Sequence, residues 1–290
     1  MTQSLLNTED FSEEIVTELD ISHLTIEDDT PVDNFQSEVQ QRLLVEPLYS
    51  SKALPSPFLA AANVGLFYKL KGDPIVPDVL LSLGVQRAED LSQRRNRSYF
   101  VWEFGKVPEV CIEIVSNSEG DELALSQKSQ QKGKEVCKKD VYAHVGVPYY
   151  VVFDPLRQIQ GKSEMNGALL RVWTLTAGRY SELTPAEGID AIGQTLWLET
   201  IELGLTLWQG AFEESLSRLW LRWCDEQGQV IPTGAERAET ERQRAETECQ
   251  RAETERQRAE AERQRAETER QRANRLAEKL RQLNINPDEV

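Results

Sequence analysis

The chain has 290 residues, of which 39% are hydrophobic and 28% are charged, and its formal net charge is −16. This length predicts one or two domains, and the modest hydrophobic content indicates that part of the chain lies outside any core. No apolar run approaches the ~18 residues of a membrane-spanning helix, and the first residues lack the pattern of a secretory signal. Four scattered cysteines without CxxC spacing exclude a disulfide framework and a zinc site, so we expect reduced thiols in a cytoplasmic protein.

The acidic charge is concentrated at the N-terminus. Residues 1–41 contain eleven Asp and Glu and no Lys or Arg, so only −5 of the net charge belongs to the rest of the chain. We expect residues 1–45 to form an acidic, flexible arm or a loosely docked helix. Order should begin near residue 46, in a domain that extends to residue 232.

A strongly acidic chain is an unusual partner for nucleic acid, because phosphates attract lysine and arginine. The uneven distribution weakens this objection, since the middle of the chain holds local basic clusters. They are residues 94–97 (RRNR) and the lysines Lys128, Lys132, Lys134, Lys138 and Lys139. Such clusters are usually solvated surface, so they give only secondary support to a DNA partner.

The central segment alternates strand-like and helix-like patterns. Runs of β-branched and aromatic residues between turn signals predict strands, whereas apolar residues at helical spacing predict helices. The predicted strands are 75–83, 98–104, 110–116 and 148–154, with a hairpin over 169–183; the predicted helices are 120–146, which Gly133 could break, and 207–225. This mixture predicts an α/β or α+β domain with a mixed sheet flanked by helices.

After Gly234 the composition changes to a strict seven-residue repeat of the type ERQRAET. Only one alanine per heptad is reliably apolar, and glutamate occupies the other position of a coiled-coil seam. Glu and Arg recur at i,i+3 and i,i+4, which stabilises a helix. The pattern predicts a long charged helix over 233–284 and a tail at 285–290. It leaves open whether the helix stands alone or forms a weak coiled coil between copies of the chain.

Two carboxylates stand inside strand-like segments, Asp78 in IVPDVLLSL and Glu113 in EVCIEIVSN. Side chains alternate between the faces of a strand, which places Glu113 with Cys111 and Val115. A charged carboxylate in a buried strand is costly unless it is paired or bound to a metal. If the two strands are neighbours, the acids meet at one edge of the sheet, where a divalent cation would remove their repulsion. Taken alone, each has a simpler reading, a turn former for Asp78 and a solvated face for Glu113.

Several of these segments resemble a known family. PDV at 77–79, IEIVS at 112–116, a helical lysine four residues before a tyrosine, and GVPYYVVFDP at 146–155 are similar to the Uma-two family of restriction endonucleases. That family is a branch of the PD-(D/E)XK nuclease superfamily, and the resemblance covers about residues 56–210. It implies a restriction-endonuclease-like mixed sheet, a site in which Asp, Glu and Lys surround Mg²⁺ or Mn²⁺, and DNA as the substrate.

On this resemblance Asp78 takes the position of the PD aspartate, and Glu113 takes that of the second acid. The superfamily's lysine lies two residues after the second acid, where this chain has Val115. The resemblance therefore assigns the lysine to the following helix, as Lys138 with Lys139 as the alternative. The expected activity is Mg²⁺-dependent hydrolysis of DNA phosphodiester bonds, with Asp78 and Glu113 as metal ligands. The alternative is an inactive nuclease fold that acts as an interaction scaffold through its C-terminal helix.

Overall fold

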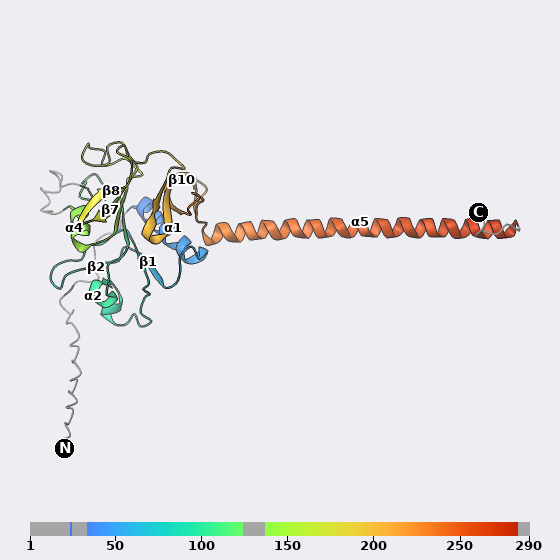
Figure 1. The fold of residues 1–290 in the computed structure, drawn as a ribbon, viewed down its shortest axis with the longest axis horizontal. Helices are drawn as coiled ribbons and strands as arrows, with labels where there is room; N and C mark the ends of the chain where they lie inside the picture. The colour runs from blue at the N-terminus through green and yellow to red at the C-terminus, as the bar shows by residue number, and fades with distance from the viewer. Residues whose placement is uncertain (1–23, 25–33, 124–136, 284–290) are drawn as a thin grey trace, which may run out of the picture. The chain divides into compact units, whose positions relative to one another are not determined.

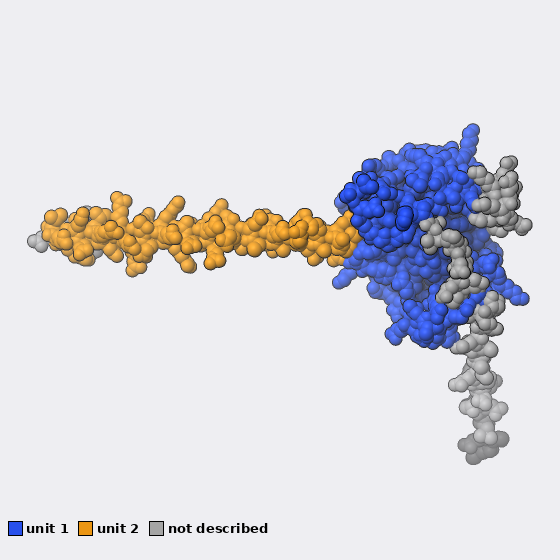
Figure 2. Space-filling model, turned by 180° about the vertical axis from the view of Figure 1, so that it is seen from behind, with its two compact units in different colours: residues 1–231 blue, residues 232–290 orange. Residues whose placement is uncertain are grey.

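The computed structural model describes residue 24, residues 34–123 and residues 137–283. The chain divides into two compact units, residues 1–231 and residues 232–290, which Figure 2 shows in separate colours. All four cysteines are free, as their spacing predicted. In the described part of the chain, no helix combines the length and apolar character needed to cross a bilayer.

The first unit is built on a six-stranded mixed sheet with the order β1–β3–β5–β6–β7–β8 (Figure 1). Strands β5 and β6 run parallel, whereas every other neighbouring pair is antiparallel. The strands are β1 (Phe58–Ala62), β3 (Val79–Leu83), β5 (Val110–Ile114), β6 (Tyr149–Phe153), β7 (Leu170–Thr176) and β8 (Arg179–Glu182). This mixed sheet with its flanking helices confirms the predicted restriction-endonuclease-like α/β class.

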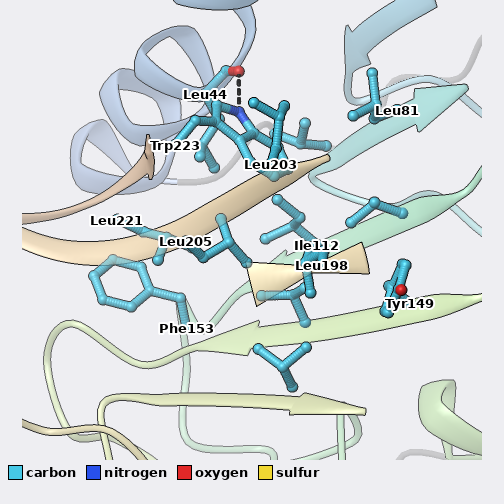
Figure 3. Packing of buried hydrophobic residues seen from close by; sticks show 14 of the residues in the cluster. Leu44, Leu81, Ile112, Tyr149, Phe153, Leu198, Leu203, Leu205, Leu221 and Trp223 are labelled. Carbon is cyan, nitrogen blue, oxygen red and sulfur yellow. Dashed lines mark hydrogen bonds between the residues drawn. The ribbon is translucent and has the colours of Figure 1, made fainter. Parts of the chain in front are cut away.

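One face of the large sheet packs against helix α1 and a three-stranded antiparallel sheet. These elements are α1 (Phe35–Ser51), β9 (Thr195–Leu198), β10 (Leu203–Ala211) and β11 (Ser217–Cys224), and the 3-10 helix η2 (Glu199–Ile201) joins β9 to β10. The core between the layers contains Leu44 of α1, Ile112 of β5 and Trp223 of β11. In Figure 3 the Trp223 indole donates to the Leu44 carbonyl at 2.8 Å, so this buried N–H is paired.

The opposite face carries helix α4 and a small two-stranded parallel sheet. In Figure 1, α4 lies on the other side of the large sheet from α1 and β10. The elements on this face are α4 (Lys138–Val145), β2 (Leu66–Phe67), β4 (Tyr99–Phe100) and α2 (Val101–Phe104), with the 3-10 helix η1 (Arg94–Asn96) before β4. Helix α4 ends at Gly146, whose φ of 96° is a conformation that glycine adopts without strain. Tyr142 of α4 is fully buried in the core of this face.

Two predicted elements are wrong. Residues 207–225 form the β10–β11 hairpin, in which Trp208 pairs with Trp220, instead of a helix. The hairpin residues that enter the core between the layers follow a two-residue period; they are Leu203, Leu205, Leu207, Leu221 and Trp223. Of the predicted strand 98–104, only Tyr99–Phe100 is a strand. The next residues form α2, which ends at Gly105 with φ 70°.

Helix α1 begins where the sequence indicated an acidic arm. The Asn34 side chain caps it by accepting from the Ser37 N–H at 3.1 Å, and Leu43 and Leu44 are fully buried. The expected arm boundary at residue 45 therefore falls inside a core helix. This core helix was not predicted because its first residues are polar.

Some predicted features lie outside the described residues. Most of the predicted arm, residues 1–23 and 25–33, is among them. Leu24 is described; it is buried, and its carbonyl accepts from the Arg94 side chain at 2.7 Å. Residues 124–136, with the expected break at Gly133, lie outside as well. Of the predicted helix 120–146, the described part is helical only over α4.

Gln40 joins α1 to β11 through both ends of its side-chain amide. Nε2 donates to the Leu221 carbonyl at 2.8 Å, and the Leu221 N–H donates to Oε1 at 2.9 Å. Gln40→Ala leaves both backbone groups buried and unpaired, so we expect urea titration to show a free energy of unfolding lower by about 2–4 kcal/mol. The control Glu38→Ala removes only a surface ion pair with Arg42 and should cost less than about 1 kcal/mol. Equal losses in the two variants would contradict this role of Gln40.

The second unit is helix α5 (Gly234–Gln282), which the heptads predicted as a long charged helix. Thr233 and Glu236 form a capping box at its start, in which each side chain accepts from the other's backbone N–H. Arg242 pairs with Glu239 at 2.9 Å and with Glu246 at 3.0 Å, at the spacings expected to stabilise a helix. Whether α5 pairs with a second copy stays a prediction.

Candidate functional site

Asp78 directly precedes β3, instead of lying inside the strand as predicted, and Glu113 lies on the adjacent antiparallel strand β5. The ladder pairs Val79 with Ile112 and Leu80 with Cys111, so continuing it by one residue places Asp78 opposite Glu113. Opposite residues of an antiparallel pair point to the same face of the sheet. Asp78, however, lies one residue outside β3, and its carboxylate accepts from Gln41 of α1, the helix on the other face, whereas Glu113 contacts Lys138 of α4. The two acids lie at the same end of the sheet, where β3 begins and β5 ends.

Asp78 is only 7% exposed, and a side-chain amide and a backbone N–H of the described residues donate to its carboxylate. Its Oδ1 accepts from Gln41 Nε2 at 2.9 Å, and its Oδ2 accepts from the Ile114 N–H at 2.6 Å. Gln41 is itself oriented, because its Oε1 accepts from Asn63 Nδ2 at 2.8 Å. Gln41 was not predicted as a site residue, because residues 1–45 were expected to form an arm. The available signal was an amide beside the apolar run of residues 43–45.

Glu113 is held by two residues of α4 and is 1% exposed. Its Oε2 pairs with Lys138 Nζ at 2.7 Å, and its Oε1 accepts from the Tyr142 hydroxyl at 2.6 Å. Burial raises the pKa of Glu113, while Lys138 and Tyr142 act in the opposite direction. Burial and the neighbouring Glu113 raise the pKa of Tyr142, so its hydroxyl keeps its proton and donates it. In the sequence analysis, the spacing to Tyr142 served only to select Lys138. In the structure, the Tyr142 hydroxyl also donates a hydrogen bond to Glu113.

The two candidate lysines point to different partners. Lys138 contacts Glu113, whereas Lys139 Nζ lies 5.0 Å from the centre of the Trp173 ring. Burial lowers the pKa of Lys138, but Glu113 and Glu122 raise it more strongly, so the amine stays charged. The basic residues Lys128, Lys132 and Lys134 lie outside the described residues.

The segment that precedes α4 brings further acids toward Lys138. The carbonyls of Asp121 and Glu122 accept from the N–H groups of Lys138 and Lys139 at 2.8 and 3.2 Å, so this segment caps α4. Burial raises the pKa of Glu122 to about 7, against the influence of Lys138. No role for either acid was predicted from the sequence, in which the only signal is an acidic pair between Gly120 and an apolar residue.

The oxygen donors suit a hard cation. Within residues 34–123 and 137–283, no group of three or more His, Cys, Asp and Glu side chains has the arrangement of a metal site. Mg²⁺, however, is usually bound through one or two carboxylates, with waters and substrate phosphates completing its coordination. Asp78 and Glu113 are carboxylates at one end of the sheet, and two carboxylates are the number that this smaller set of ligands needs.

Comparison with known proteins gives a family but no individual relative. The sequence profile of the Uma2 family, described as "Putative restriction endonuclease", matches residues 18–207. The matched range is more than half of the chain and contains Asp78, Glu113 and Lys138. No curated protein matches the chain.

Proposed function

The chain belongs to the Uma2 family, and on that premise we propose that it is a Mg²⁺-dependent endonuclease that hydrolyses phosphodiester bonds of DNA. The observation that carries this proposal is the ion pair between Lys138 and Glu113, at the end of the sheet where β3, which follows Asp78, begins. Two carboxylates for a cation and one amine for a phosphate are the groups that metal-assisted phosphodiester hydrolysis requires.

Each residue of the site has a part in the proposed mechanism. When bound between Asp78 and Glu113, a divalent cation would polarise the scissile phosphate and lower the pKa of the attacking water. The Gln41 amide and the Ile114 N–H fix the direction of the Asp78 carboxylate. Lys138 orients the water or stabilises the negative charge that develops on the phosphate. Because buried partners hold these groups, little reorganisation is needed when substrate binds.

A scaffold without catalysis is the second candidate. It is favoured by the hydrogen bonds at the two acids, because each of their four carboxyl oxygens accepts from another group of the chain. In that case the network only stabilises the fold. The working surface would be α5, which exposes Leu276 and Leu283 near its end and could pair with a second copy or with another helix.

Cleavage of supercoiled plasmid DNA by the full chain distinguishes the two candidates. We expect nicked or linear products with Mg²⁺ or Mn²⁺ and intact plasmid with EDTA. Asp78→Asn serves as the control against a contaminating nuclease, because it should not cleave. Intact plasmid with every divalent cation would contradict the nuclease function and favour the scaffold function.

A further inference from the structure

One buried carboxyl oxygen near the start of α4 has no hydrogen-bond partner in the part of the chain that the structure describes. This atom is Oε2 of Glu122, a residue that is 4% exposed. Buried polar atoms are nearly always paired, and those that are not often serve catalysis or hold a water. Glu113 differs, because both of its oxygens accept from α4. Glu122 therefore offers a free acceptor next to the site.

The main chain fixes Glu122 in this position. Its carbonyl accepts from the Tyr150 hydroxyl at 2.9 Å, from the Lys139 N–H at 3.2 Å and from Cys137 Sγ at 3.7 Å. These donors come from β6, from α4 and from the residue before α4. These contacts fix the backbone of Glu122, and with it the origin of its side chain, against α4 and β6.

The charges around Glu122 suit a group that exchanges a proton near neutral pH. They are Lys138 on α4, Asp121 beside it in the chain and Glu113 on β5. Burial raises the pKa of Glu122 to about 7, and Lys138 opposes this while the two acids reinforce it. General bases work best when their pKa lies near the working pH.

We propose that Glu122 is the general base of the reaction, with Oε2 accepting a proton from the attacking water beside Lys138. This inference rests on the proposed nuclease function. As the water oxygen bonds to phosphorus, one of its protons passes to the Glu122 carboxylate. The bond from phosphorus to the leaving oxygen breaks, and that oxygen keeps the electron pair and takes a proton from solvent. Asp78 and Glu113 are assigned to the cation in the proposed function, so neither is the base.

Glu122→Gln tests the proposal by keeping the shape of the side chain and removing the base. We expect the rate of plasmid cleavage with Mg²⁺ to fall about 10²–10⁴-fold, the usual contribution of a general base. The parent should lose activity as the pH falls below about 7, and this dependence should be absent in the variant. The matched control is Asp140→Asn, an exposed carboxylate on α4, which should cleave at the parent rate with the parent pH profile.

Chemical rescue gives an independent readout. Added formate should restore part of the activity of Glu122→Ala, because a small carboxylate can enter the vacated space and take the proton. It should not restore Glu113→Ala, whose role is to hold a cation. Absence of rescue, together with an unaltered pH profile in Glu122→Gln, would overturn the proposal.

Thermal unfolding without metal separates a catalytic role from a structural one. Because the pKa of Glu122 is raised in the folded state, this group destabilises the parent as the pH rises from about 4.5 through about 7. Glu122→Gln should therefore be at least as stable as the parent at pH 8. A large loss of stability in both the Gln and Ala variants would assign Glu122 a structural role and overturn the proposal.

The same assay distinguishes this inference from the function on which it rests. If the parent and Glu122→Gln cleave DNA equally well, the proposal of a general base is wrong but the nuclease function stands. If the parent does not cleave DNA under any condition, both the proposed nuclease function and the proposed general base are wrong.

Discussion

Glu113→Gln is expected to lower the rate of DNA cleavage by about three orders of magnitude while the protein stays folded. Glutamine has the shape of glutamate but lacks the negative charge that holds a divalent cation. Metal assistance contributes several kcal/mol to such reactions, and ~1.4 kcal/mol corresponds to a tenfold change in rate. Single-turnover cleavage measures the loss, and far-ultraviolet circular dichroism checks the fold.

Glutamine is chosen over alanine because Glu113 is the partner of two buried groups. Alanine would leave Lys138 and the Tyr142 hydroxyl unpaired, so loss of activity could reflect loss of structure. Burial raises the pKa of Glu113, which means that the buried charge opposes folding, so its removal should not unfold the protein. The control Glu103→Gln neutralises an exposed acid on α2 and should cleave like the parent. Undiminished cleavage by Glu113→Gln would refute its role as a metal ligand.

Lys138→Met should reduce cleavage by about 10²–10³-fold, whereas Lys139→Met should change it less than about threefold. The adjacent lysines form a matched pair with different contacts: one amine lies 2.7 Å from Glu113, and the other faces the Trp173 ring. A preorganised charge next to the reacting phosphate typically contributes an effect of this size. Initial rates at saturating DNA provide the comparison.

Stability has to be followed in the same lysine variants. Loss of the amine leaves Glu113 with one donor fewer, but 30% of the Lys138 side chain is exposed, so solvent offsets part of this cost. Lys138→Arg keeps the charge, and partial activity in that variant would show that charge is what the site needs. Equal losses in the Lys138 and Lys139 variants would contradict the assignment to Lys138.

The strands of the central sheet other than β1 could be predicted from the sequence because local patterns determine them. The segment YYVVF became β6, and the glycine between Thr176 and Arg179 became the turn of the β7–β8 hairpin. The alternation that put Glu113 with Cys111 and Val115 is reflected in the cores, since Cys111 and Val115 pack on the face of α4 and Ile112 packs on the other. These features depend on neighbours in the chain.

The remaining elements depend on contacts between distant segments. Helix α1 has a polar sequence, and it is buried only because β11 and the large sheet cover its apolar side. Trp220 and Trp223 fit a helical spacing as well as a strand, and pairing with β10 decided between them. Spacing to Tyr142 could select Lys138. By contrast, Gln41 reaches Asp78 across 37 residues and no local pattern indicates that contact.

Calorimetric titration of Mn²⁺ into the metal-free protein tests most directly the claim that Asp78 and Glu113 share one cation. Mn²⁺ replaces Mg²⁺ because it accepts the same oxygen ligands and commonly binds more tightly. We predict that the parent binds one ion per chain at this site and that Asp78→Asn and Glu113→Gln each abolish its binding. Parent-like affinity in either variant, or no binding by the parent, would contradict the shared site.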